Sequence, residues 1–375
     1  MKLMMKRQKT NAAGFTLVEL MIAMAVGLIV LVAIASIFNG AMTATKVVTQ
    51  RAQVQQDMRA AVDLMVKDIS LAGAGLTSGI QLPSGAGYTV SKYGCDQTGT
   101  CHVPNGTYPT VGAVSNYLYG VVPGYLNGVE ANAVIPAAPA PAVNDALTVA
   151  YTDFSNPLSG YSIAFGGTND DQITLTAAAG QTPQLINAAG GINLGDLIML
   201  TNSVGTALGE VTGFTVSGTS GTSSAGGTIT FANSDALNIN QNGVAANNTV
   251  KAIAAGASTV GTRIFVISYY ISVPAAGGTV QTPRLMRQVN GLTPVPVADN
   301  IINLQFSYDV YNSAAGALDS NQPNPIGVAE SPNNIQKVNL VVMGQSILSY
   351  GSNKAMYLAT DVSVQNLAFT NGNVY

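Results

Sequence analysis

One acidic side chain near the start of the chain has the type and position to do chemistry. Glu19 directly precedes an uncharged run from Leu20 to Phe38. A carboxylate at the centre of a bilayer costs on the order of 2.5–3.5 kcal/mol on insertion scales, so such a group is expected to have a function. A buried charge is tolerated when it is paired. We therefore expect Glu19 to pair with a positive group.

The apolar run is long enough to anchor the chain in a membrane. Residues 15–38 would make roughly 36 Å of helix, and a bilayer core is about 30 Å thick. The preceding residues include four cations, Lys2, Lys6, Arg7 and Lys9. By the positive-inside rule this leader stays cytoplasmic and everything after Phe38 lies outside. Because Gly14 precedes the apolar run, a cut there would remove charge and leave the anchor, unlike an ordinary secretory signal.

The stretch Gly14-Phe15-Thr16-Leu17-Val18-Glu19-Leu20 resembles the class III signal of type IV prepilins. In that family a prepilin peptidase cuts after the glycine and N-methylates the new first residue. The resemblance implies a leader of residues 1–14, cleavage after Gly14 and methylation of Phe15. It places Glu19 at the fifth mature position, where the family carries a glutamate. In a filament, Glu19 of one subunit could pair with the new amine of a neighbour. A plain signal anchor is the alternative.

Two cysteines form a second candidate site. Cys95 and Cys101 enclose five residues, and His102, the only histidine, follows directly. Two nearby thiols outside the cytoplasm are expected to form a disulfide, which stabilises a loop this short by about 2 kcal/mol. The alternative is a metal site, but a nearby fourth ligand is missing and the cysteine spacing is loose for zinc. We predict a disulfide and no resident metal.

The sequence contains few motifs that would indicate catalysis or cofactor binding. His102 is not accompanied by the Gly-x-Ser-x-Gly elbow of a hydrolase. The glycines at 73 and 75 follow a helix rather than a strand, so they indicate a helix end instead of a dinucleotide loop. Asp170-Asp171, and Asp319 with Asn321, could offer oxygen ligands to Ca²⁺, but polar turns are the simpler interpretation. We predict no enzyme activity and no cofactor.

The charge balance disfavours nucleic acid as a partner. Charged residues make up only 9% of the chain, the formal net charge is −3, and losing the leader would make it more negative. No Lys or Arg occurs between Lys92 and Lys251. Nucleic-acid binding needs clustered cations that neutralise phosphates. Arg263, Arg284 and Arg287 could form a small patch, although sequence alone does not place them together.

The elements that would position these residues begin with one long helix. Residues 41–72 contain no Gly or Pro, and apolar residues recur there every three or four positions, at Val54, Met58, Val62, Met65 and Ile69. We predict a helix over 15–72, with a transmembrane first half (15–38) and an amphipathic second half (39–72). Glycines at 73 and 75 would end it. A coiled-coil stem is the alternative for the second half.

After residue 73 the chain changes to short apolar runs between Gly, Pro, Asn and Ser clusters, which is typical of strands. The runs are at 146–151, 172–175, 196–201, 262–273, 302–310 and 338–343. A change of phase between Val362–Val364 and Leu367–Phe369 suggests a β-bulge. Segment 201–258, rich in Gly, Ser and Thr, is predicted as a low-complexity insertion of long loops or weak edge strands. The fold class is α+β, with the helix packed on an antiparallel, β-rich, pilin-like domain over 73–375.

The helix end at 62–73 and the segments 145–149 and 298–306 are similar to PilW-like minor pilins. This resemblance implies a structural minor pilin that helps to prime pilus assembly, with roles in adhesion, secretion or twitching motility. Implied partners are the prepilin peptidase, other major and minor pilins through the N-terminal helix, the inner-membrane assembly platform and the lipid bilayer. The chain would cross the inner membrane once, with its C-terminal domain periplasmic, and then join a pilus or pseudopilus at the cell surface.

Two alternatives to this function stay open at the level of sequence. One is a minor pseudopilin, similar to the J class, of a type II secretion or DNA-uptake system. The other is a membrane-anchored surface protein that does not polymerise.

Overall fold

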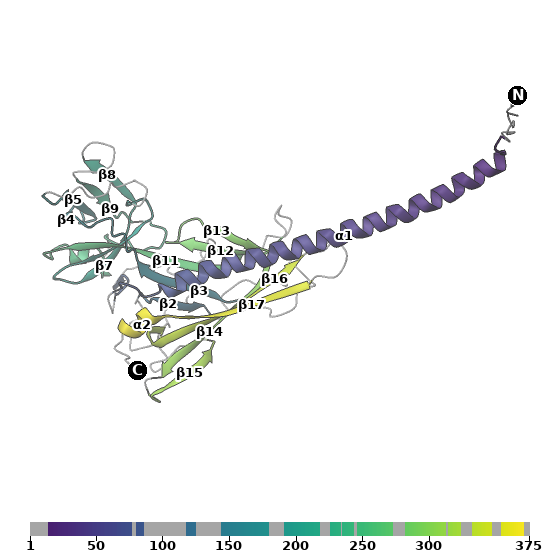
Figure 1. The fold of residues 1–375 in the computed structure, drawn as a ribbon. Helices are drawn as coiled ribbons and strands as arrows, with labels where there is room; N and C mark the ends of the chain where they lie inside the picture. The colour runs from purple at the N-terminus through teal and green to yellow at the C-terminus, as the bar shows by residue number, and fades with distance from the viewer. Residues whose placement is uncertain are drawn as a thin grey trace, which may run out of the picture. The chain divides into compact units, whose positions relative to one another are not determined.

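The computed structural model describes residues 14–76, 80–85, 118–124, 144–179, 191–217, 226–233, 235–243, 246–272, 282–312, 314–323, 332–346 and 354–370. The chain forms two compact units, Met1–Gln53 and Val54–Tyr375. Helix α1 (Leu17–Ser70) contributes its first part to one unit and its last part to the other. The structure confirms a long N-terminal apolar helix followed by an antiparallel, β-rich domain (Figure 1).

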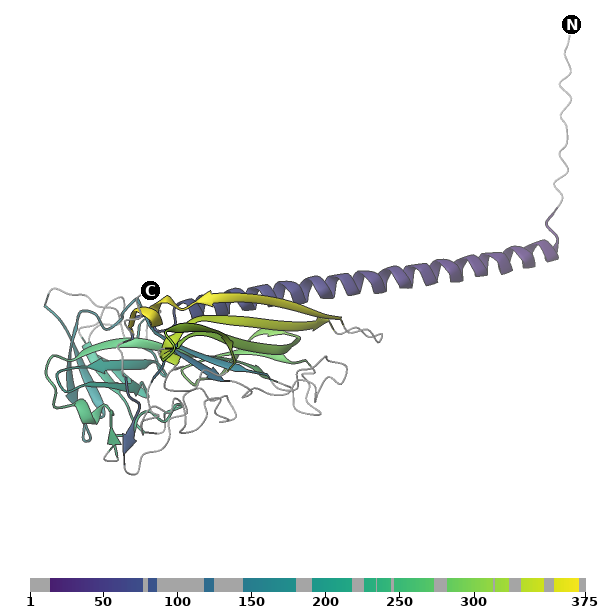
Figure 2. The ribbon, with the colours of Figure 1, turned by 90° about the horizontal axis from the view of Figure 1, so that it is seen from below.

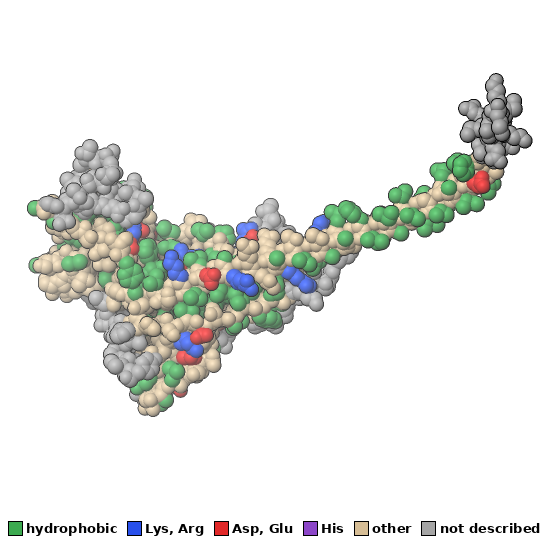
Figure 3. Space-filling model, viewed as in Figure 1, with side chains coloured by type: hydrophobic (Ala, Val, Ile, Leu, Met, Phe, Trp, Pro, Cys, Tyr) green, Lys and Arg blue, Asp and Glu red, His purple; other side chains and the backbone are tan. Residues whose placement is uncertain are grey.

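The described part of the first unit is helical from Leu17 onward. Every large apolar side chain between Phe15 and Phe38 is at least 49% exposed, on all sides of the helix. Figure 3 shows these side chains along the far part of α1. An 18-residue window of the helix has a mean hydropathy of 2.9, so α1 is long and apolar enough to cross a membrane by length and composition. A helix that is apolar all round needs an apolar environment.

The end of α1 belongs to the second unit, where one row of side chains is buried. The five residues of the predicted stripe are all buried, together with Ala61 and Asp68. Gly344 lies under this row, because a Cβ on Gly344 would meet Met58 Sδ at 2.6 Å and Val54 Cγ1 at 2.8 Å. α1 ends at Ser70, and Gly73 has a φ of 79°, which favours glycine. The helix is thus two residues shorter at each end than predicted.

A seven-stranded antiparallel sheet forms the centre of the second unit. Its main path runs β13 (Val295–Asp299), β12 (Arg284–Val289), β11 (Val260–Ser272), β3 (Ala146–Thr152) and β2 (Val121–Gly124). The first half of β11 pairs with β6 (Leu197–Thr201), which pairs with β7 (Thr206–Glu210). The second half of β11 pairs with β3. The long strand β11 therefore connects the β6–β7 pair to strand β3.

A four-stranded antiparallel sheet follows in sequence, in the order β15 (Ala317–Gln322), β14 (Ile301–Asn312), β16 (Ile335–Ser346) and β17 (Lys354–Ser363). The short helices η3 (Pro332–Asn334) and α2 (Gln365–Thr370) flank this sheet. Figure 2 shows β16 and β17 beside the buried part of α1. One apolar cluster unites α1 with both sheets, including Met65, Tyr269, Leu304 and Val342. The core of the domain thus lies between the helix and two sheets.

A second four-stranded sheet includes two strands from the segment predicted as an insertion. Its order is β4 (Tyr161–Gly166), β5 (Gln172–Ala177), β9 (Gly226–Thr230) and β8 (Gly213–Ser217). β1 (Ser84–Gly85) pairs with β10 (Ala246–Asn247), and η2 (Lys251–Ile253) follows. Long loops or weak edge strands were predicted for 201–258, yet six of its described residues, Ala207, Val211, Ile229, Phe231, Val250 and Ile253, belong to a buried apolar cluster. These few apolar side chains are enough to bury one face of the strands, and the Gly and Thr residues between them extend the strand backbone.

Two local predictions differ from the structure. The change of phase near the C-terminus is not a bulge: β17 pairs with β16 without a register shift up to Ser363, and α2 begins at Gln365. The hydrophobic spacing shifts there because a strand gives way to a helix. β14, predicted to be half-buried, is covered on both faces along much of its length, since Asn303 and Asp309 are buried as well.

Candidate functional site

The predicted pairing residue Glu19 lies in the first turn of α1 and caps it. Glu19 Oε2 accepts a hydrogen bond from the Thr16 backbone N–H at 2.9 Å and one from the Thr16 hydroxyl at 3.0 Å. The Glu19 N–H donates in return to Thr16 Oγ1 at 3.3 Å. This reciprocal arrangement is a capping box, which satisfies N–H groups that a helix start leaves without partners. Glu19 therefore has a local partner within its own chain.

Thr16 is the residue that our sequence analysis missed. The spacing Thr16-x-x-Glu19 before an apolar run is itself the signature of a capping box. Recognising it would have placed the helix start at Leu17 rather than Phe15, as the structure has it. The acid drew attention because of its charge, and its role as the third helical residue was overlooked.

Gly14 and Phe15 lie just before the helix and are exposed. A Cβ added at Gly14 would meet nothing within 4 Å. The fold of this unit consequently accepts a larger residue at position 14. Any demand for a small residue there must come from a protein that recognises the segment. The leader, residues 1–13, lies outside the described residues.

In the second unit, a buried polar cluster joins the end of α1 to the central sheet. Asp68 accepts hydrogen bonds from Tyr151 Oη on β3 at 3.0 Å, Tyr269 Oη on β11 at 2.6 Å and Arg287 Nε on β12 at 2.8 Å. The Asp68 side chain is only 2% exposed, and that of Arg287 is 26% exposed. Burial and the charge of Asp68 raise the pKa of both tyrosines, so both hydroxyls keep their protons. Burial lowers the pKa of Arg287, but bonding to Asp68 outweighs it and raises that pKa.

The three arginines considered as a basic patch are each paired with acids. Arg263 forms ion pairs with Asp153 and Asp196, and Arg284 pairs with Asp299. Arg287 lies opposite Tyr269 on β11, six residues along the strand from Arg263, a separation of roughly 20 Å. They therefore do not form one cluster of free cations.

A pair of buried carboxyl groups joins β7 to the loop after β9. The Glu210 oxygens accept from the Ala236 and Leu237 N–H groups at 3.2 and 3.1 Å. The oxygens of Asp235 accept from two further N–H groups of the same loop, at 2.7 and 2.9 Å. Burial and the neighbouring charge of Asp235 raise the pKa of Glu210 to about 7. Two adjacent carboxylates cannot both ionise cheaply, so one proton is retained near neutral pH.

The remaining predicted site residues are the two cysteines with His102 and the acidic turns considered for Ca²⁺. Cys95, Cys101 and His102 lie outside the described residues. Asp319 accepts a hydrogen bond from Asn312 Nδ2 at 2.8 Å, and Asn321 is bonded to Asp309 through its backbone N–H at 2.9 Å. Asp170 lies in a turn with a φ of 53°. Among the described residues, no group of three or more His, Cys, Asp or Glu side chains is arranged to hold a metal ion.

Comparison with known proteins gives one finding. Residues 9–35 match a family model described as the prokaryotic N-terminal methylation motif. Neither the curated proteins nor the solved structures compared with this chain gave a match. The motif spans Gly14, Phe15, Glu19 and most of the apolar run, and it supports a type IV pilin-like class III signal. It implies processing by a prepilin peptidase and pilins as partners. Motif and apolar helix together support a type IV pilin-like or pseudopilin protein with a membrane anchor.

Proposed function

We propose that this chain is a structural minor pilin of the PilW-like group, a filament subunit rather than an enzyme. One observation carries the proposal: the methylation motif at 9–35 is continuous with a helix whose apolar side chains are exposed all round. Such a helix can move from a bilayer into a bundle of like helices without exposing apolar surface to water. The end of α1, from Val54 onward, would carry the β-rich domain on the filament, since one row of its side chains is buried against the sheets.

Glu19 would then have two roles, as the cap of its own helix and as the partner of a neighbouring subunit. Cleavage after Gly14 leaves the Thr16 donors in place, so the capping box survives processing. Within the described residues, the hydrogen bonds that the Glu19 carboxylate accepts all go to Oε2. A carboxylate has about four acceptor sites, so Oε1 keeps the capacity to bind the amine of Phe15 on a neighbouring subunit. The cap would fix the orientation of the acid before that pairing.

Mass spectrometry of the N-terminus, on protein from native membranes, tests the processing step. We expect a mature chain that begins with N-methylated Phe15. Gly14→Glu should keep the leader, whereas the matched Gly14→Ala should still be cut. Because the fold leaves position 14 open, a block in the glutamate variant reports recognition rather than misfolding. An intact leader in the wild type, or normal maturation of Gly14→Glu, would overturn the proposal.

Assembly tests the finer assignment. We expect the mature chain in sheared pili at a level far below that of the major subunit, and fewer pili when its gene is deleted. Loss of exoprotein release with normal pili would instead identify a pseudopilin. A processed chain that never enters a filament would refute both.

A further inference from the structure

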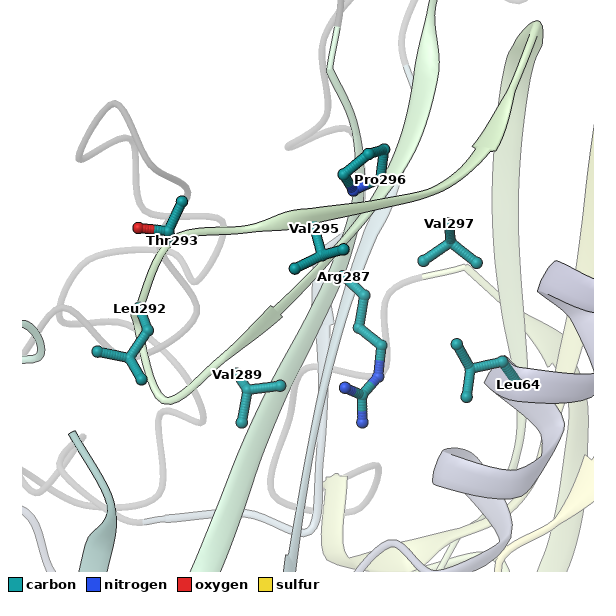
Figure 4. A pocket seen from close by; sticks show the side chains of 8 residues that line it. All are labelled: Leu64, Arg287, Val289, Leu292, Thr293, Val295, Pro296 and Val297. Carbon is teal, nitrogen blue, oxygen red and sulfur yellow. The ribbon is translucent and has the colours of Figure 1, made fainter. Parts of the chain in front are cut away.

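A pocket of about 410 Å³ lies in the second unit beside the end of α1, where the hairpin β12–β13 approaches the helix. It is lined by Leu64, Arg287, Val289, Leu292, Thr293, Val295, Pro296 and Val297 (Figure 4). Six of these eight side chains are hydrocarbon. The size and the mostly apolar lining, with one charged group, fit a binding pocket for a small group or a side chain.

Among the described residues that line the pocket, Arg287 is the only charged one. In Figure 4 its guanidinium extends into the space between Leu64 and Val289. Nε donates to Asp68 at 2.8 Å and to Tyr269 Oη at 3.1 Å, and within the described residues no hydrogen bond involves the two terminal nitrogens, which form the end of the guanidinium fork. An arginine fork of this kind recognises a carboxylate through two parallel hydrogen bonds. Its pairing with Asp68 keeps Arg287 charged and in position.

The rim of the pocket is apolar and exposed. Leu292 and Val295 are both exposed, Val295 at 63%. Gly195 packs against this rim, because a Cβ on it would lie 2.6 Å from the Leu292 side chain. β13 is the outer strand of the central sheet, but Pro296 lacks the N–H that an added strand would need. A partner would therefore bind through side chains rather than by strand addition.

We propose that this pocket receives an aliphatic side chain of another protein, with a carboxylate within one helical turn of it that binds the Arg287 fork. The hydrocarbon lining would desolvate the aliphatic group, and charge complementarity selects the acid. A singly charged carboxylate fits better than a doubly charged phosphate, because repulsion by the nearby Asp68 grows with the charge of the ligand. The proposal holds whether or not the chain assembles into a filament.

The first test uses 4-methylpentanoate, which combines a carboxylate with a branched aliphatic group, against the full chain in detergent micelles. Ligand-observed NMR should show binding that is at least tenfold tighter than binding of the neutral 4-methylpentanamide. Val295→Glu should abolish it by placing a carboxylate at the rim. The matched control is Val260→Glu, because Val260 is 62% exposed and lies on β11, outside the pocket lining. Equal binding of acid and amide, or equal loss in both variants, would overturn the proposal.

The second test identifies the occupant in cells. A photo-crosslinking amino acid replaces Val295 in one strain and Val260 in another, and crosslinked peptides are sequenced by mass spectrometry. We expect a crosslink specific to position 295, on a peptide with Asp or Glu within four residues of Leu, Ile or Val. A crosslink to a segment without an acid would refute the proposal. Binding of the small acid with no protein crosslink specific to position 295 would assign the pocket to a small carboxylate and refute a protein partner.

Discussion

The cluster around Asp68 permits a quantitative test of what holds α1 on the sheet. Asp68→Ala removes a carboxylate that accepts three hydrogen bonds, from Tyr151, Tyr269 and Arg287. Breaking a buried ion pair by deleting one partner costs about 3–5 kcal/mol, because the remaining charge is left without compensation. The Arg287 side chain is 26% exposed, so water can partly solvate it. We therefore take the low end, about 3 kcal/mol.

This loss converts into a measurable shift in melting temperature. Unfolding entropy is roughly 2.1 cal/mol/K per residue, so the roughly 220 described residues of the second unit give a shift of about 7 °C for 3 kcal/mol. The assay is thermal unfolding of the full chain in detergent micelles, followed by near-ultraviolet circular dichroism of the 15 tyrosines, because the chain has no tryptophan. The matched control is Asp63→Ala, at an exposed position on the same helix, where a change within about 0.5 kcal/mol is expected.

A double variant separates charge from packing. If the unpaired guanidinium causes the loss, Asp68→Ala with Arg287→Leu should recover about 1 kcal/mol or more relative to Asp68→Ala alone. Two results would refute the reasoning. One is a melting temperature of Asp68→Ala within 1 °C of the Asp63→Ala control. The other is a double variant that is less stable than Asp68→Ala.

Three further predictions concern other parts of the chain. Glu210 has a raised pKa of about 7 in the folded state, so its contribution to stability is full below about pH 4.5 and falls as the pH rises through 7. The melting temperature should drop between pH 5 and pH 8 by an amount worth about 2–3 kcal/mol, and Glu210→Gln should remove most of that drop; an unchanged drop would contradict the assignment. Gly344→Val should destabilise the second unit by about 1–3 kcal/mol in urea unfolding, because its side chain would collide with Val54 and Met58; wild-type stability would show that α1 does not lie close over β16. Glu19→Leu should still be cut and methylated but should enter filaments poorly, as counted by electron microscopy; normal filament numbers would refute the pairing role.

Local patterns in the sequence predicted much of the fold. The uncharged run from Leu20 to Phe38, the three-and-four spacing of Val54 to Ile69 and the glycines after residue 72 predicted the long helix and its end. These signals are local, because helix period and glycine conformation depend on neighbouring residues alone. The strands that contain 146–151, 197–201 and 302–310 were found for the same reason. The Thr16–Glu19 cap was equally readable and was simply overlooked.

Tertiary structure decided what depends on residues far apart in the chain. Sequence spacing gave no sign that Asp68 meets Tyr269 and Arg287, which lie 201 and 219 positions away. Nor did it show that strands of the Gly- and Thr-rich segment 201–258 would complete a sheet with 161–177, because the composition of a segment does not indicate which strand it pairs with. By itself the sequence determined the signal, the anchor and the helix, because each is encoded in a contiguous stretch. The buried polar clusters and the Arg287 pocket exist only where the folded sheets bring separate stretches together.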